Sequence, residues 1–146
     1  MGVTPAITTA ELVERLMRSA HRLRRASAKA LAPLGLTPAQ ERMLRLVSRG
    51  ESPWRMGELA SRMGIVPRSA TSLVDALEQA GLVERAIDPE NRRSILVRLT
   101  EHGLAVQREM AEARATAGEH LFAQLDDSER WVLAELLDKV APPEDH

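Results

Sequence analysis

The 146-residue sequence contains no cysteine and no tyrosine, and it has only one phenylalanine and two tryptophans. Without cysteine the chain forms no disulfide, no thiolate metal site and no cysteine-based oxidation sensor. So few aromatic side chains leave little surface for stacking against an aromatic ligand. Functions that depend on thiol chemistry are therefore excluded.

Long apolar segments and catalytic motifs are also missing. No run of 18 apolar residues occurs, and residues 1–9 lack the charged start and apolar stretch of a signal peptide. We therefore expect a soluble cytoplasmic protein with no membrane partner. The sequence has no phosphate-binding loop, no dinucleotide fingerprint, and no nucleophile, base and carboxylate at motif spacing. We do not expect an enzyme.

The four histidines are scattered rather than grouped as ligand pairs; they are His21, His102, His120 and His146. Because no two share the H-x-x-x-H spacing of one helix face, we expect surface or helix-packing residues, with no metal and no cofactor. A site assembled across helices stays open as the alternative, and His21 on the first predicted helix is then its first candidate.

The net charge of -1 conceals an uneven distribution along the chain. Residues 1–100 hold 16 Lys and Arg against 10 Asp and Glu, whereas residues 101–146 hold 4 against 11. A basic part and an acidic far end would orient the molecule toward the phosphate backbone of a nucleic acid. From Arg68 to Thr100 there are five charges of each sign. In that segment the placement of individual residues has to carry any DNA contact.

Residues 56–81 have the pattern of two helices joined by a tight turn. A helix over residues 56–63 has an apolar face made of Leu59, Ala60 and Met63. Gly64 follows, and glycine tolerates the left-handed conformation in which many helices end. Pro67 suits the first position of a second helix, which runs to Gly81. This order is typical of a helix-turn-helix and favours DNA binding.

The second helix of the pair divides into an apolar and a polar face. Its inward side chains are Ala70, Leu73, Val74 and Leu77. Its outward side chains are Arg68, Ser69, Thr71, Ser72 and Asp75. Hydroxyl groups and an arginine fork can reach base edges and phosphate oxygens in a major groove, although a solvated amphipathic helix has the same pattern. The candidate DNA-binding residues of this region are Arg55, Arg68, Ser69, Thr71 and Ser72.

A β-hairpin is predicted after the second helix. Residues 82–87 and 95–99 alternate as strands, and Asp-Pro-Glu-Asn at 88–91 is turn chemistry. Arg92 and Arg93 therefore lie near the hairpin tip, where they can reach a minor groove or its phosphates. We add both to the candidate DNA-binding residues, with an ordinary surface pair as the alternative.

Residues 88–100 (DPENRRSILVRLT) resemble the wing of the MarR (multiple antibiotic resistance regulator) family, and residues 74–78 (VDALE) and 81–85 (GLVER) resemble the segment before it. The order of elements is similar over about residues 10–140, and the specific motifs lie within 56–103. The resemblance implies a homodimeric winged helix-turn-helix transcription factor. Such a protein binds double-stranded DNA and commonly represses its target until a small molecule binds.

Two positions depart from the family pattern. Asn91 stands where family wings often have Asp, whose carboxylate would brace Arg93; Asn91 can hydrogen-bond Arg93 without that charge. We expect Asp88 and Asn91 to support the wing. Ser72 stands where many relatives have Arg, and Arg68 lies one turn earlier, so operator preference is expected to differ from that of better-known members.

Helices are predicted on both sides of the winged segment. Residues 8–32 have apolar side chains at helical spacing together with a basic run that is solvated, bound to phosphate or paired with the acidic C-terminal helices. Thr37 and Gln40 form a capping box. A long helix runs from a Thr100 cap to about residue 124, and another, opened by Asp127 or Ser128, ends before the Pro142-Pro143 pair.

The fold class that follows is mainly α with a small β-hairpin wing. Residues 37–100 are predicted to form a winged helix-turn-helix DNA-binding domain. Residues 1–36 and 101–146 are predicted to form a helical dimerisation region, because the terminal helices carry more apolar surface than one chain needs to bury. A two-fold homodimer would present two recognition helices to a palindromic operator.

Two functional alternatives remain at this stage. The same helix pair would also suit a winged-helix protein–protein interaction module with weak or no DNA binding. For a small-molecule effector, the resemblance suggests a crevice between the helical region and the winged domain, for which Met17, His21, Met43 and Trp54 are candidate liners. Packing roles explain these residues equally well, so we assign no ligand contacts.

Overall fold

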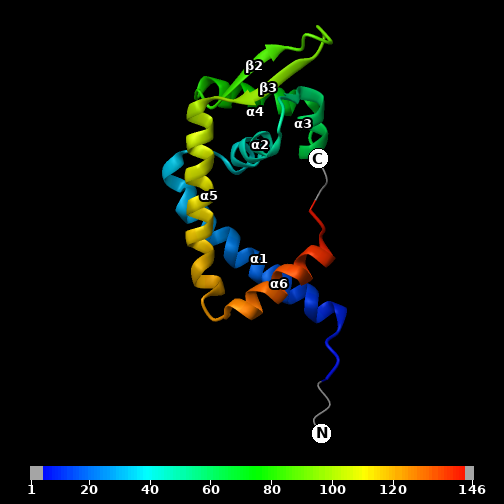
Figure 1. Ribbon diagram of the computed structural model, residues 1–146, viewed down its shortest axis with the longest axis vertical. Helices are drawn as coiled ribbons and strands as arrows, with labels where there is room; N and C mark the ends of the chain where they lie inside the picture. The colour runs from blue at the N-terminus through cyan, green and yellow to red at the C-terminus, as the bar shows by residue number, and fades with distance from the viewer. Residues whose placement is uncertain (1–4, 144–146) are drawn as a thin grey trace. The chain divides into compact units, whose positions relative to one another are not determined.

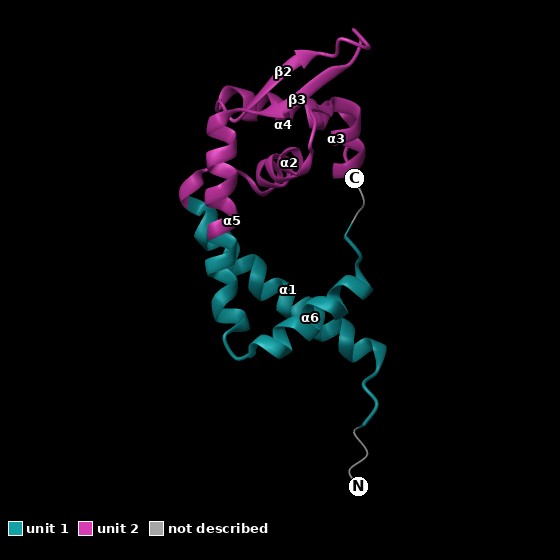
Figure 2. Cartoon of the chain, viewed as in Figure 1, with its two compact units in different colours: residues 1–32, 113–145 teal, residues 33–112, 146 magenta. Residues whose placement is uncertain are grey.

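The computed structural model describes residues 5–143, which divide into two compact units. Unit 1 comprises residues 5–32 and 113–143, and unit 2 comprises residues 33–112 (Figure 2). Helix α5 (Glu101–Phe122) contributes residues to both units. The unit boundaries along the chain therefore fall at 32/33 and 112/113, whereas the sequence predicted domain boundaries at 36/37 and 100/101.

Unit 2 consists of helices packed on a small sheet (Figure 1). In chain order its elements before α5 are α2 (Pro38–Arg49), β1 (Trp54–Arg55), α3 (Met56–Met63), α4 (Pro67–Gln79), β2 (Val83–Ile87) and β3 (Ile95–Leu99). Helices α2, α3 and α4 pack against one another, and α2 and α3 also contact β3. The fully buried side chains at these contacts include Met43, Leu44, Leu59, Ala70, Val74, Leu77 and Val97. This core holds α4 and the hairpin in one folded unit.

The helix boundaries of unit 2 lie at the residues that the sequence indicated. Thr37 accepts a hydrogen bond from the N–H of Gln40, which in turn caps the Thr37 backbone. Gly64 ends α3 in the left-handed region at φ 65°, and Pro67 occupies the first turn of α4. Gly81, also left-handed at φ 75°, follows the end of α4. These turns bring α3 and α4 together as a helix-turn-helix, and the predicted fold class is confirmed.

The sheet has three antiparallel strands in the order β1-β3-β2. Val83 to Ile87 pairs with Leu99 to Ile95, which forms the predicted hairpin. The sequence did not predict β1, in which Trp54 pairs with Val97 and Arg55 with Leu96. Two residues are too few for an alternating pattern to be recognised, so this strand arises from tertiary pairing. It joins the segment before α3 directly to the wing.

The start of α5 is clamped to the turn between α4 and β2. The Thr100 hydroxyl donates to the Gly81 carbonyl over 2.6 Å and accepts from the Gly103 N–H over 2.9 Å. The Thr100 N–H donates to the Leu82 carbonyl over 3.1 Å. Gly103 packs so closely that a Cβ atom there would collide with the Leu82 carbonyl. The predicted Thr100 cap is confirmed, and a glycine permits this close approach.

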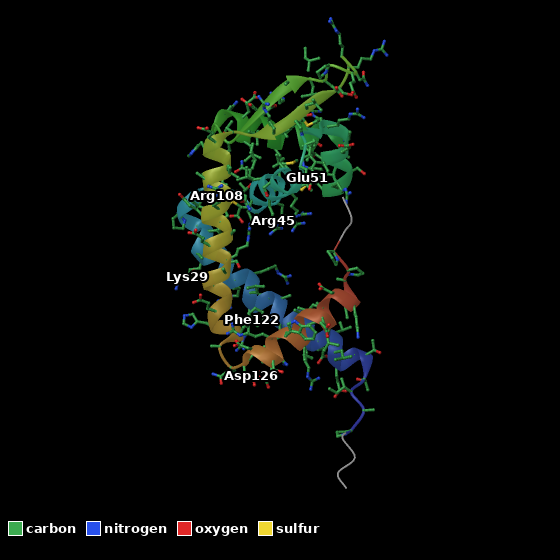
Figure 3. All side chains as sticks on the ribbon, in the orientation of Figure 1. Lys29, Arg45, Glu51, Arg108, Phe122 and Asp126 are labelled. Atoms are coloured by element: carbon green, nitrogen blue, oxygen red, sulfur yellow. The ribbon has the colours of Figure 1, made fainter. Side chains whose placement is uncertain are left out.

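Unit 1 contains α1 (Thr9–Leu31), the second part of α5, and α6 (Asp127–Val140). The short 3-10 helix η1 (Ala32–Leu34) spans the boundary between the two units. Thr8 and Glu11 cap α1 reciprocally, and hydrogen bonding to the Thr8 backbone lowers the pKa of Glu11. Asp126, labelled in Figure 3, caps α6 through the Glu129 N–H. The predicted Asp127 or Ser128 cap was therefore wrong by one or two residues, because Asp and Ser have similar capping preferences and three candidates stand in a row.

Unit 1 leaves many apolar side chains exposed. No described residue of α6 is buried, and Trp131 and Val140 are 64% and 73% exposed. The other large exposed apolar residues of this unit are Ile7, Leu12, Val13, Leu16, Met17, Val132, Leu136 and Leu137. Among the described residues, no helix combines the length and apolarity needed to cross a bilayer. An exposed apolar surface of this extent in one chain indicates a surface that is covered by something else.

Candidate nucleic-acid interface

The outer face of α4 is polar and accessible. Its exposed residues are the predicted Arg68, Ser69, Thr71 and Ser72. Ala70, Val74 and Leu77 on the opposite face are fully buried, which fixes the rotation of the helix about its own axis. Arg68 and Ser69 lie in the first turn, the part of a recognition helix that contacts base edges. The structure thus presents a small polar surface with one guanidinium group at its N-terminal end.

Two hydroxyl groups on this face donate to the helix itself. The Thr71 hydroxyl donates to the Pro67 carbonyl over 3.0 Å, and the Ser72 hydroxyl donates to the Arg68 carbonyl over 3.1 Å. Their hydrogens are therefore engaged, and their oxygens keep lone pairs free to accept. In this arrangement Thr71 and Ser72 match amino groups of adenine or cytosine in the major groove.

An arginine that the sequence did not single out ties α4 to the wing. The Arg85 guanidinium on β2 contacts the Asp75 carboxylate over 2.7 Å and the Glu78 carboxylate over 3.2 Å. The hydrogen bonds that the Arg85 side chain donates to the Glu78 carboxylate are the main cause that raises the pKa of Arg85. Asp75, which the sequence placed on the outward face, is therefore paired rather than an isolated negative charge opposite DNA. No spacing in the sequence indicates this pair, because Asp75 and Arg85 belong to different elements.

The wing turn carries two exposed arginines on a closed set of hydrogen bonds. The Asp88 N–H donates to the Ser94 carbonyl over 3.0 Å, and the Ser94 N–H donates to the Asn91 carbonyl over 2.8 Å. Arg92 and Arg93 within this turn are exposed. In Figure 1 the loop between β2 and β3 projects beyond the helices of its unit. The two guanidinium groups are therefore carried on an ordered, projecting loop.

Asn91 supports this loop by a hydrogen bond to the backbone of Arg93 rather than to its side chain. Its side-chain oxygen accepts the backbone N–H of Arg93 over 3.2 Å. The expected hydrogen bond to Arg93 is present, but it goes to the main chain. Asn91 therefore shapes the turn, and the exposed Arg93 guanidinium stays available to solvent or a phosphate.

Asp88 anchors the base of the wing and is only 4% exposed. One of its oxygens accepts the Glu90 N–H over 2.9 Å, and the other contacts Nε of Arg55 over 3.3 Å. Arg55 lies in β1, just before α3, and its side chain is 49% exposed. The candidate DNA contact Arg55 is thus also a tether between the helix-turn-helix and the wing. The sequence had placed Asp88 correctly in the wing but offered no signal for this partner.

Alanine at Asp88 should destabilise the fold more than asparagine does. Asp88→Ala removes both contacts from a buried position and should lower the free energy of unfolding by about 1–3 kcal/mol. Asp88→Asn keeps one acceptor oxygen for the Glu90 N–H but places its NH2 group opposite the Arg55 guanidinium, so the ion pair is lost. This variant should cost less than alanine, about 1 kcal/mol. Urea unfolding at one protein concentration measures both values. Glu84→Ala, which removes an exposed pair with Arg98, is the control and should change stability little. An equal loss of unfolding free energy in Asp88→Ala and Asp88→Asn would show that the hydrogen bond to the Glu90 N–H does not contribute separately.

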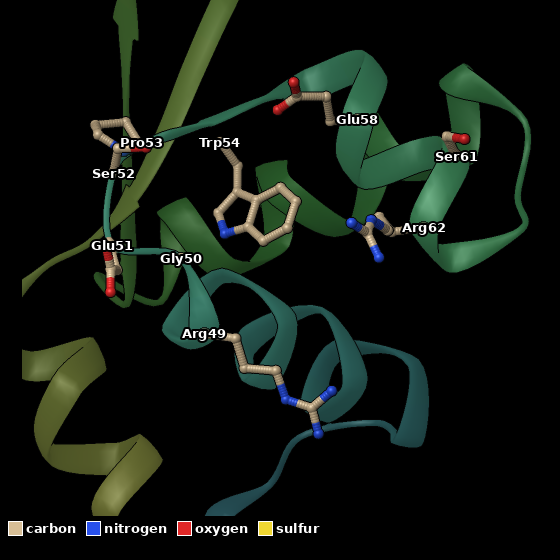
Figure 4. Close-up of a pocket in the computed structure, with 9 residues that line it drawn as sticks. All are labelled: Arg49, Gly50, Glu51, Ser52, Pro53, Trp54, Glu58, Ser61 and Arg62. Atoms are coloured by element: carbon tan, nitrogen blue, oxygen red, sulfur yellow. The ribbon is translucent and has the colours of Figure 1, made fainter. Parts of the chain in front are cut away.

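A pocket of about 570 Å³ lies within unit 2, between the end of α2 and α3. Figure 4 shows the Trp54 indole in it, with Arg49 from α2 and Arg62 from α3 around it. Glu51 and Glu58 also line it, so its formal charges balance and favour no class of ligand. Of the four candidate liners of an effector crevice, Trp54 lines this pocket, Met43 is fully buried, and Met17 and His21 are exposed. Among the described residues, no group of three or more His, Cys, Asp or Glu side chains is arranged to hold a metal ion.

This chain is similar to known transcriptional regulators in sequence and in structure. The sequence profile of the MarR family matches residues 36–95. The transcriptional repressor MdtR of Bacillus subtilis is 30% identical over 107 residues, which cover 73% of this chain and 68% of MdtR. The crystal structure of apo MarR from Escherichia coli is similar over 94% of this chain and 99% of its own, with a TM-score of 0.75 and 27% identity. That of CouR from Rhodococcus jostii, bound to p-coumaroyl-CoA, is similar over 93% of this chain and 95% of its own, with a TM-score of 0.72 and 28% identity.

Proposed function

The chain belongs to the MarR family of transcriptional regulators, and we propose that it is a homodimeric repressor that binds a palindromic operator in double-stranded DNA and is released by a small-molecule effector. A protein of this kind works in the cytoplasm and needs no catalytic group. The observation that carries the proposal is the common placement in unit 2 of the polar face of α4 and the arginine-bearing wing.

In the complex we assign the two parts different tasks. Arg68, Ser69, Thr71 and Ser72 enter the major groove from the first turns of α4 and contact base edges and phosphates. Arg92 and Arg93 on the wing contact the adjacent minor groove or its phosphates. Arg55 donates its Nε–H to Asp88, and its side chain is half exposed. It can therefore contact a phosphate only through its remaining N–H groups.

Dimerisation supplies the second half-site contact. A second copy of this chain is the simplest cover for the exposed apolar residues of unit 1, and a symmetric dimer places two recognition helices about 34 Å apart along the duplex. A single winged helix would bind DNA weakly. An effector lowers operator affinity if it binds better to a dimer whose helix separation no longer matches that repeat.

We expect sedimentation at micromolar concentration and physiological salt to give a dimer. Introducing Val132→Asp with Leu136→Asp should shift it to monomer, because these side chains are 47% and 51% exposed in one chain and would be buried by a partner. Lys139→Glu, on the same helix at an exposed polar position, should remain dimeric. Monomeric wild-type protein, or a dimer unaffected by both aspartates, would contradict the proposed interface.

Selection of bound duplexes from a random-sequence pool tests the proposed function. Wild-type protein should enrich an inverted repeat whose half-sites are one or more helical turns apart. Failure to enrich any sequence at low ionic strength would favour the alternative of a protein–protein interaction module.

A further inference from the structure

Val66 is an exposed apolar residue at the N-terminal end of α4. It is the N-cap of the helix, and 63% of its surface is exposed. Of the exposed residues that follow it in the helix, Pro67 is apolar, and Arg68 and Ser69 are polar. Single exposed apolar residues are ordinary on protein surfaces, so exposure alone carries no inference. The position in the helix makes Val66 unusual.

Valine is a poor choice for the position on grounds of stability. N-caps favour Ser, Thr, Asn or Asp, whose side chains accept an N–H of the first turn, and Val66 makes no such bond. Its carbonyl nevertheless accepts from the N–H groups of Ser69 and Ala70 over 3.0 and 3.2 Å, which fixes its backbone. The branched side chain has few rotamers. The isopropyl group is therefore restricted to few orientations, outside the core and at the end of α4 that the proposed function places in a groove.

The major groove offers one apolar group on the edges of unmodified base pairs, the C5 methyl of thymine. We propose that Val66 is a specificity-determining residue that contacts this methyl group and selects thymine at one position of each half-site. The inference rests on the proposed function, because it assumes that the first turn of α4 faces base edges. It adds apolar selection of thymine to the polar contacts of Arg68, Ser69, Thr71 and Ser72.

Deoxyuridine isolates the contact, because it differs from thymidine only by the missing methyl group. The probe is the palindromic duplex that full-length wild-type protein selects from a random pool, with thymines replaced by deoxyuridine at one symmetric pair of positions at a time. We expect one pair at which the replacement weakens wild-type binding by about tenfold, the factor supplied by burial of a methyl group in each of two half-sites. Fluorescence anisotropy at fixed salt measures the ratio of the two dissociation constants.

Val66→Ser separates recognition from folding. It removes the isopropyl group and supplies the hydroxyl that N-caps favour, so α4 should be at least as stable as in the wild type. For this variant, the dissociation constant of the uracil duplex divided by that of the thymine duplex should fall from about ten to about one at that position. Ile87→Ala is the matched control, since Ile87 is also 63% exposed but lies on β2, and it should keep the wild-type ratio.

Each outcome has a distinct meaning. If no sequence is enriched in the selection, the proposed function fails and this inference fails with it. If an operator is found but no thymine pair is sensitive to uracil, or if Val66→Ser keeps the wild-type ratio, the role of Val66 is overturned while DNA binding stands. Loss of the ratio in Ile87→Ala as strongly as in Val66→Ser would also overturn it.

Discussion

Replacing Arg92 and Arg93 together by alanine is expected to lower operator affinity by about a hundredfold at physiological salt. Both residues are exposed on a turn whose backbone is closed by the bonds between Asp88, Asn91 and Ser94. Their guanidinium groups therefore approach DNA without a large ordering cost. Each phosphate contact that is lost also lowers the number of counterions released on binding, and the dimer loses two contacts in each of its two half-sites. The slope of log affinity against log salt should therefore become shallower by about four.

The salt titration separates lost contacts from lost structure. The double variant should unfold like the wild type in urea, because neither side chain is buried. Lys139→Ala removes an exposed positive charge on α6 and should leave both the affinity and the slope unchanged. An unchanged slope in the double variant would show that the wing does not contact phosphates.

Gly103→Ala is expected to cost about 2–3 kcal/mol of stability, at the upper end of what overpacking by one carbon usually does. The added Cβ would collide with the backbone carbonyl of Leu82, and a backbone atom cannot rotate away as a side chain can. The same carbonyl accepts the Thr100 N–H, so any shift of Leu82 also disturbs the clamp at the start of α5. Urea unfolding at fixed protein concentration measures the loss.

Gly57→Ala is the matched control for that measurement. Gly57 lies in α3, and a Cβ there would meet no atom within 4 Å. Alanine should therefore leave stability unchanged or raise it by up to about 1 kcal/mol, since helical glycine loses more entropy on folding. A Gly103→Ala protein as stable as Gly57→Ala would contradict the close approach to Leu82.

The helix-turn-helix could be predicted from local signals because the residues at which its helices end and begin have distinctive backbone preferences. Gly64 supplies a left-handed residue that other side chains rarely adopt, and Pro67 has the backbone angle of a first helical turn. The hairpin followed from alternating apolar residues on either side of an Asp-Pro-Glu-Asn turn. The exposed face of α4 followed from the burial of Ala70, Val74 and Leu77 on the other side. Each of these predictions depends only on residues that are close to one another in the sequence.

Contacts between distant segments were not predictable in the same way. Strand β1 is two residues long and exists through its pairing with β3, and the Arg55 to Asp88 pair joins residues 33 positions apart. Arg85 could have been a solvent-facing strand residue until α4 placed Asp75 and Glu78 beside it. Val66 could not be predicted as a contact residue, because the two apolar residues in the turn between the helices, Ile65 and Val66, belong to no periodic pattern. The roles of these residues depend on neighbours that only the folded chain brings close to them.

The most direct test of DNA recognition by paired copies is a comparison of two duplexes of equal length and composition. One carries the selected inverted repeat, and the other carries the same bases in scrambled order. At physiological salt we expect at least about a thousandfold tighter binding to the repeat, with two chains bound per duplex. Equal affinity for both duplexes, persisting at low ionic strength, would contradict sequence-specific recognition by the α4 and wing surface.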